Sequence, residues 1–170
     1  MIRARKHAVI WHNQQKRDRL GLAETEAEET LSKINTNKEI IELGLALLYL
    51  GEGFKKSPTT GMGNSDPLLL KFFLKIMLNI YSIDMEKIRF DLHIRADQNP
   101  ELLKKYWAKE LGAPIHRFRT VSTDKRTTGR PTYPDYKGVC VINCGKIAVQ
   151  RKLVYIGQKF CRKTIEELGG

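Results

Sequence analysis

The sequence predicts an α+β fold, and three features support that prediction. Residues 40–50 and 68–81 are apolar stretches of helical length, and each follows residues that commonly begin helices. Residues 86–95 alternate between apolar and polar side chains, which is the pattern of a strand with one buried and one open face. At 170 residues and 41% hydrophobic, the chain can bury a core. We expect one main domain, 36–160, an arm, 1–35, and a short tail, 161–170.

The composition favours a polyanionic partner. Lysine and arginine number 30 against 19 acidic residues, which gives a net charge of +11. Such an excess favours phosphate-bearing ligands, because each phosphate contact releases condensed counterions. No stretch is apolar enough to cross a bilayer and no signal peptide is evident, so we expect no membrane partner and a cytoplasmic location. The three cysteines are odd in number and late in the chain, which argues against a disulfide framework.

The arm, residues 1–35, contains no proline and a single glycine, Gly21, and is predicted to be mostly helical. Its first part is basic and its second part is acidic. Charge blocks of this kind are usually solvated helix faces. The alternative is that the basic part contacts nucleic acid while the acidic part lies against a basic surface of the protein's own dimer.

A buried helix is predicted to follow the arm. Thr36 and Glu39 have the spacing of a capping box, and the residues after them leave almost no polar face. Gly51 and Gly53 are expected to end the helix and to leave Glu52 at its C-terminal tip. The helix dipole disfavours a carboxylate there. A bound divalent cation would relieve this repulsion; the alternative is a solvated glutamate at the surface.

Residues 45–53 resemble the motif of the LAGLIDADG homing-endonuclease family. The positions that agree with the family pattern are Leu45, Ala46, Leu48, Gly51, Glu52 and Gly53. Leu47 stands where the family often has glycine, and Leu50 stands where it often has an acidic residue. The resemblance covers residues 36–160, but only the motif itself is specific.

The resemblance implies an αββαββα domain whose antiparallel sheet forms a saddle on double-stranded DNA. In that family the motif helices of two domains pack together, so one motif per chain implies a homodimer. The expected interface residues are Gly44, Ala46, Leu47 and Leu48. Glu52 would bind Mg²⁺ or another divalent cation and would be catalytic in a DNA endonuclease. Lys55 or Lys56 would stabilise charge on the scissile phosphate, unless both are ordinary surface lysines on a hairpin.

Two other functions remain open. A DNA-binding regulator that keeps the fold without the chemistry is favoured by the loss of an acidic residue at Leu50. An RNA-binding protein would have the same charge, and aromatic residues in a basic segment could stack on unpaired bases. These aromatic residues are Phe118, Tyr133 and Tyr136.

The elements after the motif follow from local signals. Residues 54–64 are rich in turn formers and predict a small hairpin. Asp66 and Pro67 begin a core helix, and Asn99 and Pro100 begin a second helix, which is an insertion relative to the family pattern. A last strand is expected at 139–143 and a covering helix at 146–160, with Gly157 near its end.

The open face of strand 86–95 and the basic segment 116–137 are predicted to contact DNA. Strand residues on the open face can read base edges or grip phosphates, and a basic loop can clamp the phosphate backbone. The alternative for the strand is an ordinary solvated sheet face. The candidate DNA-binding residues are Arg89, His93, Arg95, Arg117, Arg119, Lys125, Arg126 and Arg130.

Overall fold

A computed structural model describes residues 2–169, with side chains from Val9 onward. The chain divides into two compact units, which meet between Asn37 and Lys38. The first unit is the arm, and it consists of a single long helix, α1 (Ile2–Ser32). Every described side chain of α1 is exposed, including Trp11. The helix is therefore held by its own backbone bonds and by local pairs such as Gln14 with Asp18.

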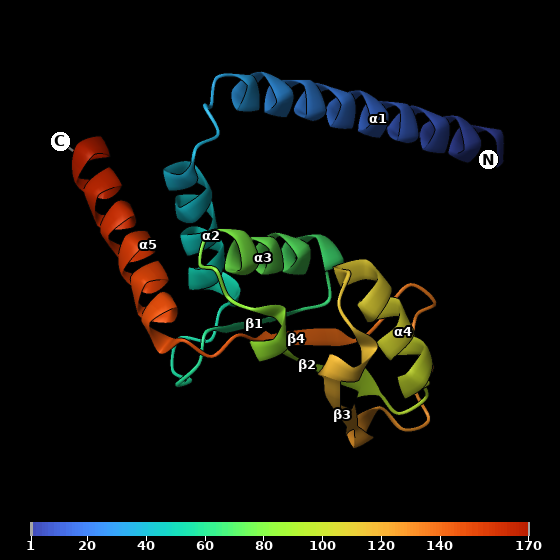
Figure 1. Cartoon of the computed structure of the whole chain (residues 1–170). Helices are drawn as coiled ribbons and strands as arrows, with labels where there is room; N and C mark the ends of the chain where they lie inside the picture. Colours follow the sequence, from blue (N-terminus) through green and yellow to red (C-terminus); the bar gives the residue numbers. More distant parts are fainter. Residues whose placement is uncertain (1, 170) are drawn as a thin grey trace. The chain divides into compact units, whose positions relative to one another are not determined.

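The second unit is α+β, as predicted, and is built on a mixed four-stranded sheet with the order β1-β4-β2-β3 (Figure 1). The strands are β1 (Gly61–Asn64), β2 (Arg89–Arg95), β3 (Phe118–Asp124) and β4 (Val139–Asn143). β4 pairs antiparallel with both β1 and β2. β2 and β3 pair in parallel, so the expectation of a wholly antiparallel sheet is wrong at this pair. A helix between them returns the chain in the same direction, as parallel strands require.

Five helices are present in the described residues: α1, α2 (Lys38–Glu52), α3 (Pro67–Asn79), α4 (Pro100–Leu111) and α5 (Ile147–Leu168). Three short 3₁₀ helices, η1 (Met85–Lys87), η2 (Ile115–Arg117) and η3 (Lys125–Thr127), adjoin the strands. The predicted caps of α3 and α4 are confirmed, because the side chains of Asp66 and Asn99 accept hydrogen bonds from the backbone of the first turn. α2 begins one residue later than a cap at Thr36 would require.

Two local expectations near α5 and β1 are wrong. α5 continues through Gly157 to Leu168, so most of the expected tail 161–170 is helical. Residues 54–60 form no strand, and the predicted hairpin is reduced to one bridge between Gly53 and Met62. The reason is that the buried Gln150 of α5 donates through Nε2 to backbone carbonyls of this segment, including Ser57 O at 2.7 Å.

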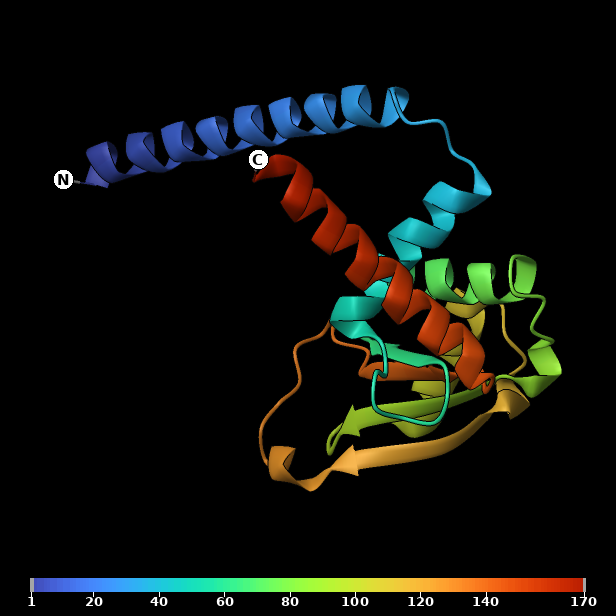
Figure 2. The same ribbon diagram turned by 90° about the vertical axis from the view of Figure 1, so that its left-hand side faces the viewer.

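The core lies between one face of the sheet and the helices α2, α3 and α4. Figures 1 and 2 both show α2 and α3 on the same side of the sheet. The predicted alternation of β2 is confirmed, because Phe90, Leu92 and Ile94 are buried whereas Arg89 and His93 are exposed. Phe118 is also buried, and its ring stacks on Phe90 with 4.8 Å between centroids. It is therefore a core residue and not a surface platform for bases.

Further buried contacts join the helices to the sheet. Tyr49 of α2 stacks on Phe73 of α3. Trp107 of α4 is fully buried and donates from Nε1 to Lys137 O at 2.8 Å, which ties the segment before β4 to α4. Cys144 is buried, and burial raises the pKa of its thiol to about 12. No described helix is both long and apolar enough to cross a membrane.

Candidate nucleic-acid interface

The face of the sheet opposite the helices carries the polar residues of β2. In register with them, β3 contributes Thr120 beside Asp91 and Ser122 beside His93. Asn143 of β4 donates from Nδ2 to Asp91 Oδ2 at 3.0 Å. We call this surface the outer face. It offers the exposed cation of Arg89 and the exposed hydroxyls of Thr120 and Ser122, which can bind phosphates and base edges, around the half-buried Asp91–Asn143 pair.

A basic loop, residues 125–137, begins where β3 ends at the rim of the outer face. Lys125 and Arg126 are exposed in η3, and Arg130 is exposed further along. Arg126 pairs with Asp124, with 2.9 Å between Nε and Oδ1 and 3.0 Å between Nη2 and Oδ2. This pairing lowers the pKa of Asp124 and offsets the charge of its carboxylate. In the described part of the chain neither Lys125 nor Arg130 has an ion-pair partner.

Most of the candidate DNA-binding residues lie on the surface, but Arg117 does not. It is 7% exposed, and its Nε donates to Ile88 O at 2.9 Å while Nη2 donates to Glu86 O and Ile88 O. Its Nη1 also lies 3.5 Å from Glu86 Oε2. The prediction that Arg117 contacts DNA is therefore wrong. η2 turns the side chain inward, where it satisfies the carbonyls of the segment leading into β2.

Arg117 and Arg119 give a matched pair of substitutions. We expect Arg117→Met to lower the free energy of unfolding by about 3 kcal/mol, because it removes both donors from the buried carbonyl of Ile88 and one from the carbonyl of Glu86. Arg119→Met changes an exposed side chain and should leave stability unchanged. Urea unfolding of both variants measures the difference. Equal stability of the two would contradict a structural role for Arg117.

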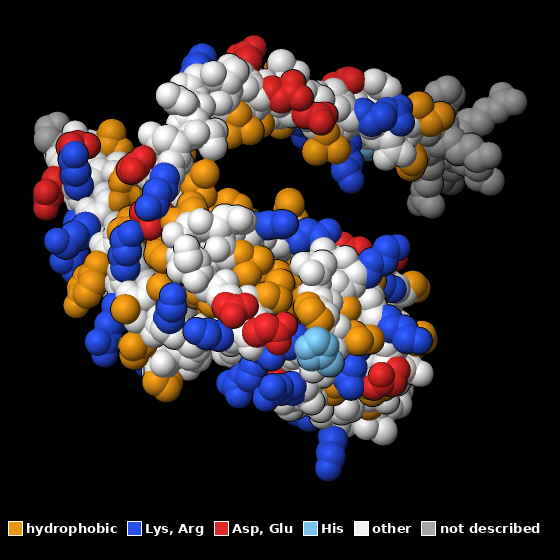
Figure 3. Space-filling model, viewed as in Figure 1, with side chains coloured by type: hydrophobic (Ala, Val, Ile, Leu, Met, Phe, Trp, Pro, Cys, Tyr) orange, Lys and Arg blue, Asp and Glu red, His pale blue; other side chains and the backbone are white. Residues whose placement is uncertain are grey.

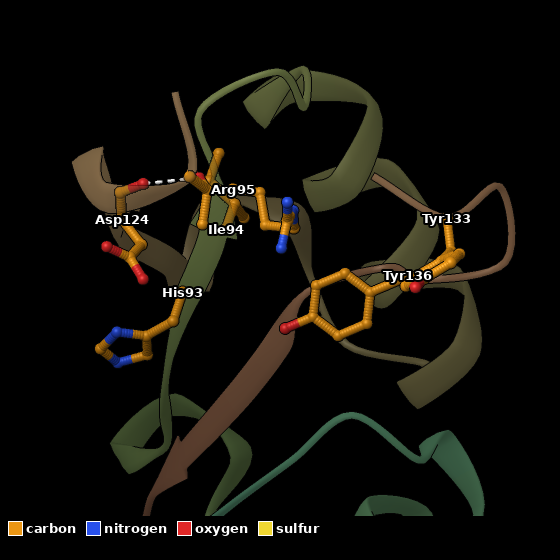
Figure 4. Close-up of a pocket in the computed structure, with 7 residues that line it drawn as sticks. His93, Ile94, Arg95, Asp124, Tyr133 and Tyr136 are labelled. Atoms are coloured by element: carbon orange, nitrogen blue, oxygen red, sulfur yellow. Dashed lines mark hydrogen bonds between the residues drawn. The ribbon is translucent and has the colours of Figure 1, made fainter. Parts of the chain in front are cut away.

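Arg95 lies neither on the open surface nor in the core. It is half-buried and lines a cavity of about 410 Å³ at the ends of β2 and β3. The other lining residues are His93, Ile94, Asp124, Thr127, Tyr133 and Tyr136 (Figure 4). Arg95 donates from Nη2 to Arg130 O at 3.0 Å, and its buried Nε has no hydrogen-bond partner within the described residues.

Glu52 lies where the sequence predicts it, exposed at the C-terminal end of α2. Its Oε2 accepts a hydrogen bond from Asn64 Nδ2 at 3.1 Å. The partial negative charge at the C-terminal end of a helix favours a nearby cation. Lys55 provides it, because its Nζ donates to Leu50 O at 2.6 Å and to Gly51 O at 3.3 Å. Both Lys55 and Lys56 are exposed, and Lys55 is the one that caps the helix.

The described residues of a single chain do not form a complete magnesium site. Among the described residues no group of three or more His, Cys, Asp or Glu side chains is placed to hold a metal ion. Mg²⁺ commonly takes one or two protein carboxylates together with substrate phosphates. Glu52 beside Asn64 supplies a single carboxylate, so it would fit Mg²⁺ only where DNA phosphates supply further oxygens.

The expected dimer-interface residues are separated by the fold. Ala46 is fully buried inside the chain, beneath Gly157 of α5. Its assignment to an interface between copies is therefore wrong. Leu48 is half-buried, whereas Gly44 and Leu47 are exposed. The motif glycine Gly53 has a structural role, because a Cβ there would lie 2.5 Å from the Tyr49 ring.

Two features of the surface escaped the sequence analysis. One is the cavity beside Arg95, which needs the ends of separate strands and the basic loop together. The other is the exposed side of α5, which Figure 3 shows lined with lysine and arginine. Arg151, Tyr155, Lys159 and Arg162 recur there at helical spacing and are exposed. That spacing was a readable signal, although it predicts only a solvated cationic face.

Comparisons of this chain with protein-family models, with curated proteins and with solved structures found no match. The resemblance of residues 45–53 to the LAGLIDADG motif therefore stays a prediction from sequence. What the structure establishes is an α+β unit with a mixed four-stranded sheet, an outer face carrying Arg89 and His93, and a basic loop at the rim of that face.

Proposed function

We propose that this chain binds double-stranded DNA through the outer face and the basic loop. The observation that carries the proposal is that side chains of β2 and of the basic loop line one hollow. His93 of β2 lines a shallow depression together with Lys125 and Arg126 of η3, so the strand and the loop contribute to one surface. Arg89 lies further along β2 on the same outer face, with Asp91 between it and His93.

The chemistry of this surface suits a duplex. Exposed lysine and arginine neutralise phosphates, and the net charge of +11 adds a long-range attraction for DNA. The major groove is wide enough to admit paired strands, and guanidinium groups bind the edge of guanine through two hydrogen bonds. Thr120 and Ser122 add hydroxyl groups, which can donate to phosphates or to bases.

Site-specific cleavage of DNA is the second candidate function, and the exposed carboxylate of Glu52 at the end of α2 favours it. The proposed enzyme is a homodimer in which two copies of Glu52, held by Asn64, bind Mg²⁺ with the DNA phosphates. Since Ala46 is buried within the chain, such a dimer would have to use exposed residues of α2 such as Gly44 and Leu47.

The test of DNA binding is the affinity of the whole protein for a labelled random-sequence duplex across a series of salt concentrations. We expect the logarithm of the binding constant to fall linearly with the logarithm of salt concentration. Each neutralised phosphate contributes about −0.9 to the slope, so four or five contacts give a slope of about −4. Absence of duplex binding at low salt would refute the proposal. Tighter binding to duplex RNA or to single strands would favour an RNA-binding protein instead.

Cleavage is tested in the same mixtures with magnesium added. Cleavage by the wild type that Glu52→Gln abolishes, with duplex binding retained, would establish the endonuclease. Binding without cleavage by either protein would leave DNA recognition as the function. Glu52→Gln is a suitable control because the glutamine side chain keeps a hydrogen-bonding partner for Asn64 and removes the charge.

A further inference from the structure

The cavity beside Arg95 is walled by aromatic and apolar side chains next to a cation. Figure 4 shows the ring of Tyr136 extending toward Arg95, with Tyr133 behind it on the basic loop and His93 at the opposite side. Tyr133 is 83% exposed and borders a second cavity, of about 450 Å³, on the other side of the loop. An aromatic ring this exposed is accessible for stacking on a base.

The loop that carries the two tyrosines is fixed to the body of the unit. Thr132 donates to Asp97 through both its backbone N–H and its hydroxyl, at 2.7 and 2.5 Å, and these bonds lower the pKa of Asp97. Gln98 donates to Tyr136 O at 2.7 Å, and Arg95 donates to Arg130 O at 3.0 Å. Both the residues after β2 and the end of β2 itself thus hold the loop in place. The cavity is therefore largely preformed, which lowers the entropy lost on binding.

The charges around the cavity leave Arg95 available. The nearby carboxylates of Asp124 and Asp97 attract Arg95 electrostatically, but their hydrogen bonds go to Arg126 and Thr132. The hydroxyl of Thr127 is also occupied, because it donates to Asp124 O at 2.6 Å and accepts from Ala96 N at 2.8 Å. Arg95 makes one bond through Nη2, and its Nε has no partner among the described residues. A ligand with acceptor atoms on a flat apolar body matches these surroundings.

We propose that this cavity receives one unpaired nucleobase of the DNA bound on the outer face. The base stacks on the tyrosines of the basic loop and presents its acceptor edge to the guanidinium of Arg95. A free phosphate is a poorer match, because the walls are mostly aromatic and aliphatic. His93 and Asp124 line both this cavity and the depression beside Lys125, so the two hollows adjoin. The inference rests on the proposed function.

The test compares a fully paired DNA duplex with the same duplex carrying one bulged nucleotide. A base in a helix must be unstacked and unpaired before it can enter, whereas a bulged base has no partner to lose. We expect the whole protein to bind the bulged duplex about tenfold more tightly, which corresponds to the lower part of the range for stacking one base on an aromatic side chain. Fluorescence of 2-aminopurine at the bulged position should change on binding as the base changes its stacking partner.

Variants at one exposed position identify the cavity as the site. Tyr133→Ala should abolish the preference for the bulged duplex and the fluorescence change, while binding to the paired duplex persists. Tyr133→Trp should retain both, because it keeps a stacking surface. Tyr155→Ala is the matched control, since Tyr155 is also exposed but lies on α5.

Each outcome separates the two proposals. Equal affinity for bulged and paired duplexes would overturn the nucleobase site and leave DNA binding intact. A preference that Tyr133→Ala does not diminish would also overturn it. Failure to bind either duplex would overturn the proposed function and this inference together. A tighter complex with bulged RNA than with bulged DNA would refute DNA as the ligand of the cavity.

Discussion

Gly157→Leu is expected to lower the free energy of unfolding of the second unit by about 3 kcal/mol, the upper end for overpacking a well-packed core. Gly157 is buried where α5 crosses α2. A Cβ at this position would lie 2.6 Å from Leu50 Cδ1, 2.9 Å from Leu50 Cγ and 3.1 Å from the carbonyl oxygen of Ala46. The last of these atoms belongs to a helix backbone and cannot rotate away. A leucine side chain would therefore separate the helices.

Gln158→Leu provides the control, because Gln158 is the next residue of the same helix and is exposed. It places the same leucine side chain at an exposed position of the helix without a clash, so its effect on stability should stay within about 0.5 kcal/mol. Urea unfolding followed by the fluorescence of the buried Trp107 measures both variants. A Gly157→Leu protein as stable as the wild type would mean that α5 does not pack against α2 in solution.

Replacing Lys125, Arg126 and Arg130 together with alanine is expected to weaken duplex binding by about a hundredfold at low salt. The reason is that the three side chains lie at the rim of the outer face and are exposed. Each lost phosphate contact should reduce, by about 1, the steepness with which the logarithm of the binding constant falls with the logarithm of salt concentration. Loss of all three contacts should therefore change that slope by about 3. Binding measured at several salt concentrations gives both quantities.

A second triple variant tests whether the location of the cationic side chains matters, or only the net charge of the protein. Lys75, Lys105 and Lys109 are exposed on α3 and α4, which cover the opposite face of the sheet. Changing these three lysines to alanine lowers the net charge of +11 by as much as the first triple variant does. We expect this variant to keep most of the wild-type affinity and slope. Equal losses of duplex affinity in the two variants would show that net charge alone drives binding. The basic loop would then not be a specific DNA-binding segment.

Elements specified by adjacent residues were predictable from the sequence. The caps at Asp66 and Asn99, the alternation of β2 and the position of Glu52 at a helix end all arise from neighbouring residues. The parallel pairing of β2 with β3 was not predictable, because it depends on where the intervening helix directs the chain. The same holds for Arg117, whose sequence context resembles that of the exposed Arg119. The placement of η2 beside the segment that leads into β2 decides which of the two arginines turns inward.

Gly157 and Lys55 show how tertiary contacts override local signals. Glycine usually weakens a helix, so the sequence predicts that α5 ends at about residue 160, just after Gly157. The structure continues α5 because that glycine lets two backbones approach, and the gain in packing exceeds the loss in helix propensity. Similarly, nothing in the sequence indicates that Lys55 folds back onto the carbonyls of Leu50 and Gly51, although the helix dipole explains why it does.

The central position of β4 has a consequence for the order in which the protein folds during synthesis. β4 joins β1 to β2, yet it follows every other strand in the chain, and Gly61 of β1 pairs with Asn143. While the ribosome is still making residues 65–138, β1 has no strand to pair with. α2 also has no α5 to pack against, so apolar residues such as Leu45 remain exposed to water. The parallel pair β2–β3 is complete much earlier. Release of residues 139–168 is therefore the step that closes the core, and pairings so distant in sequence make that step slow.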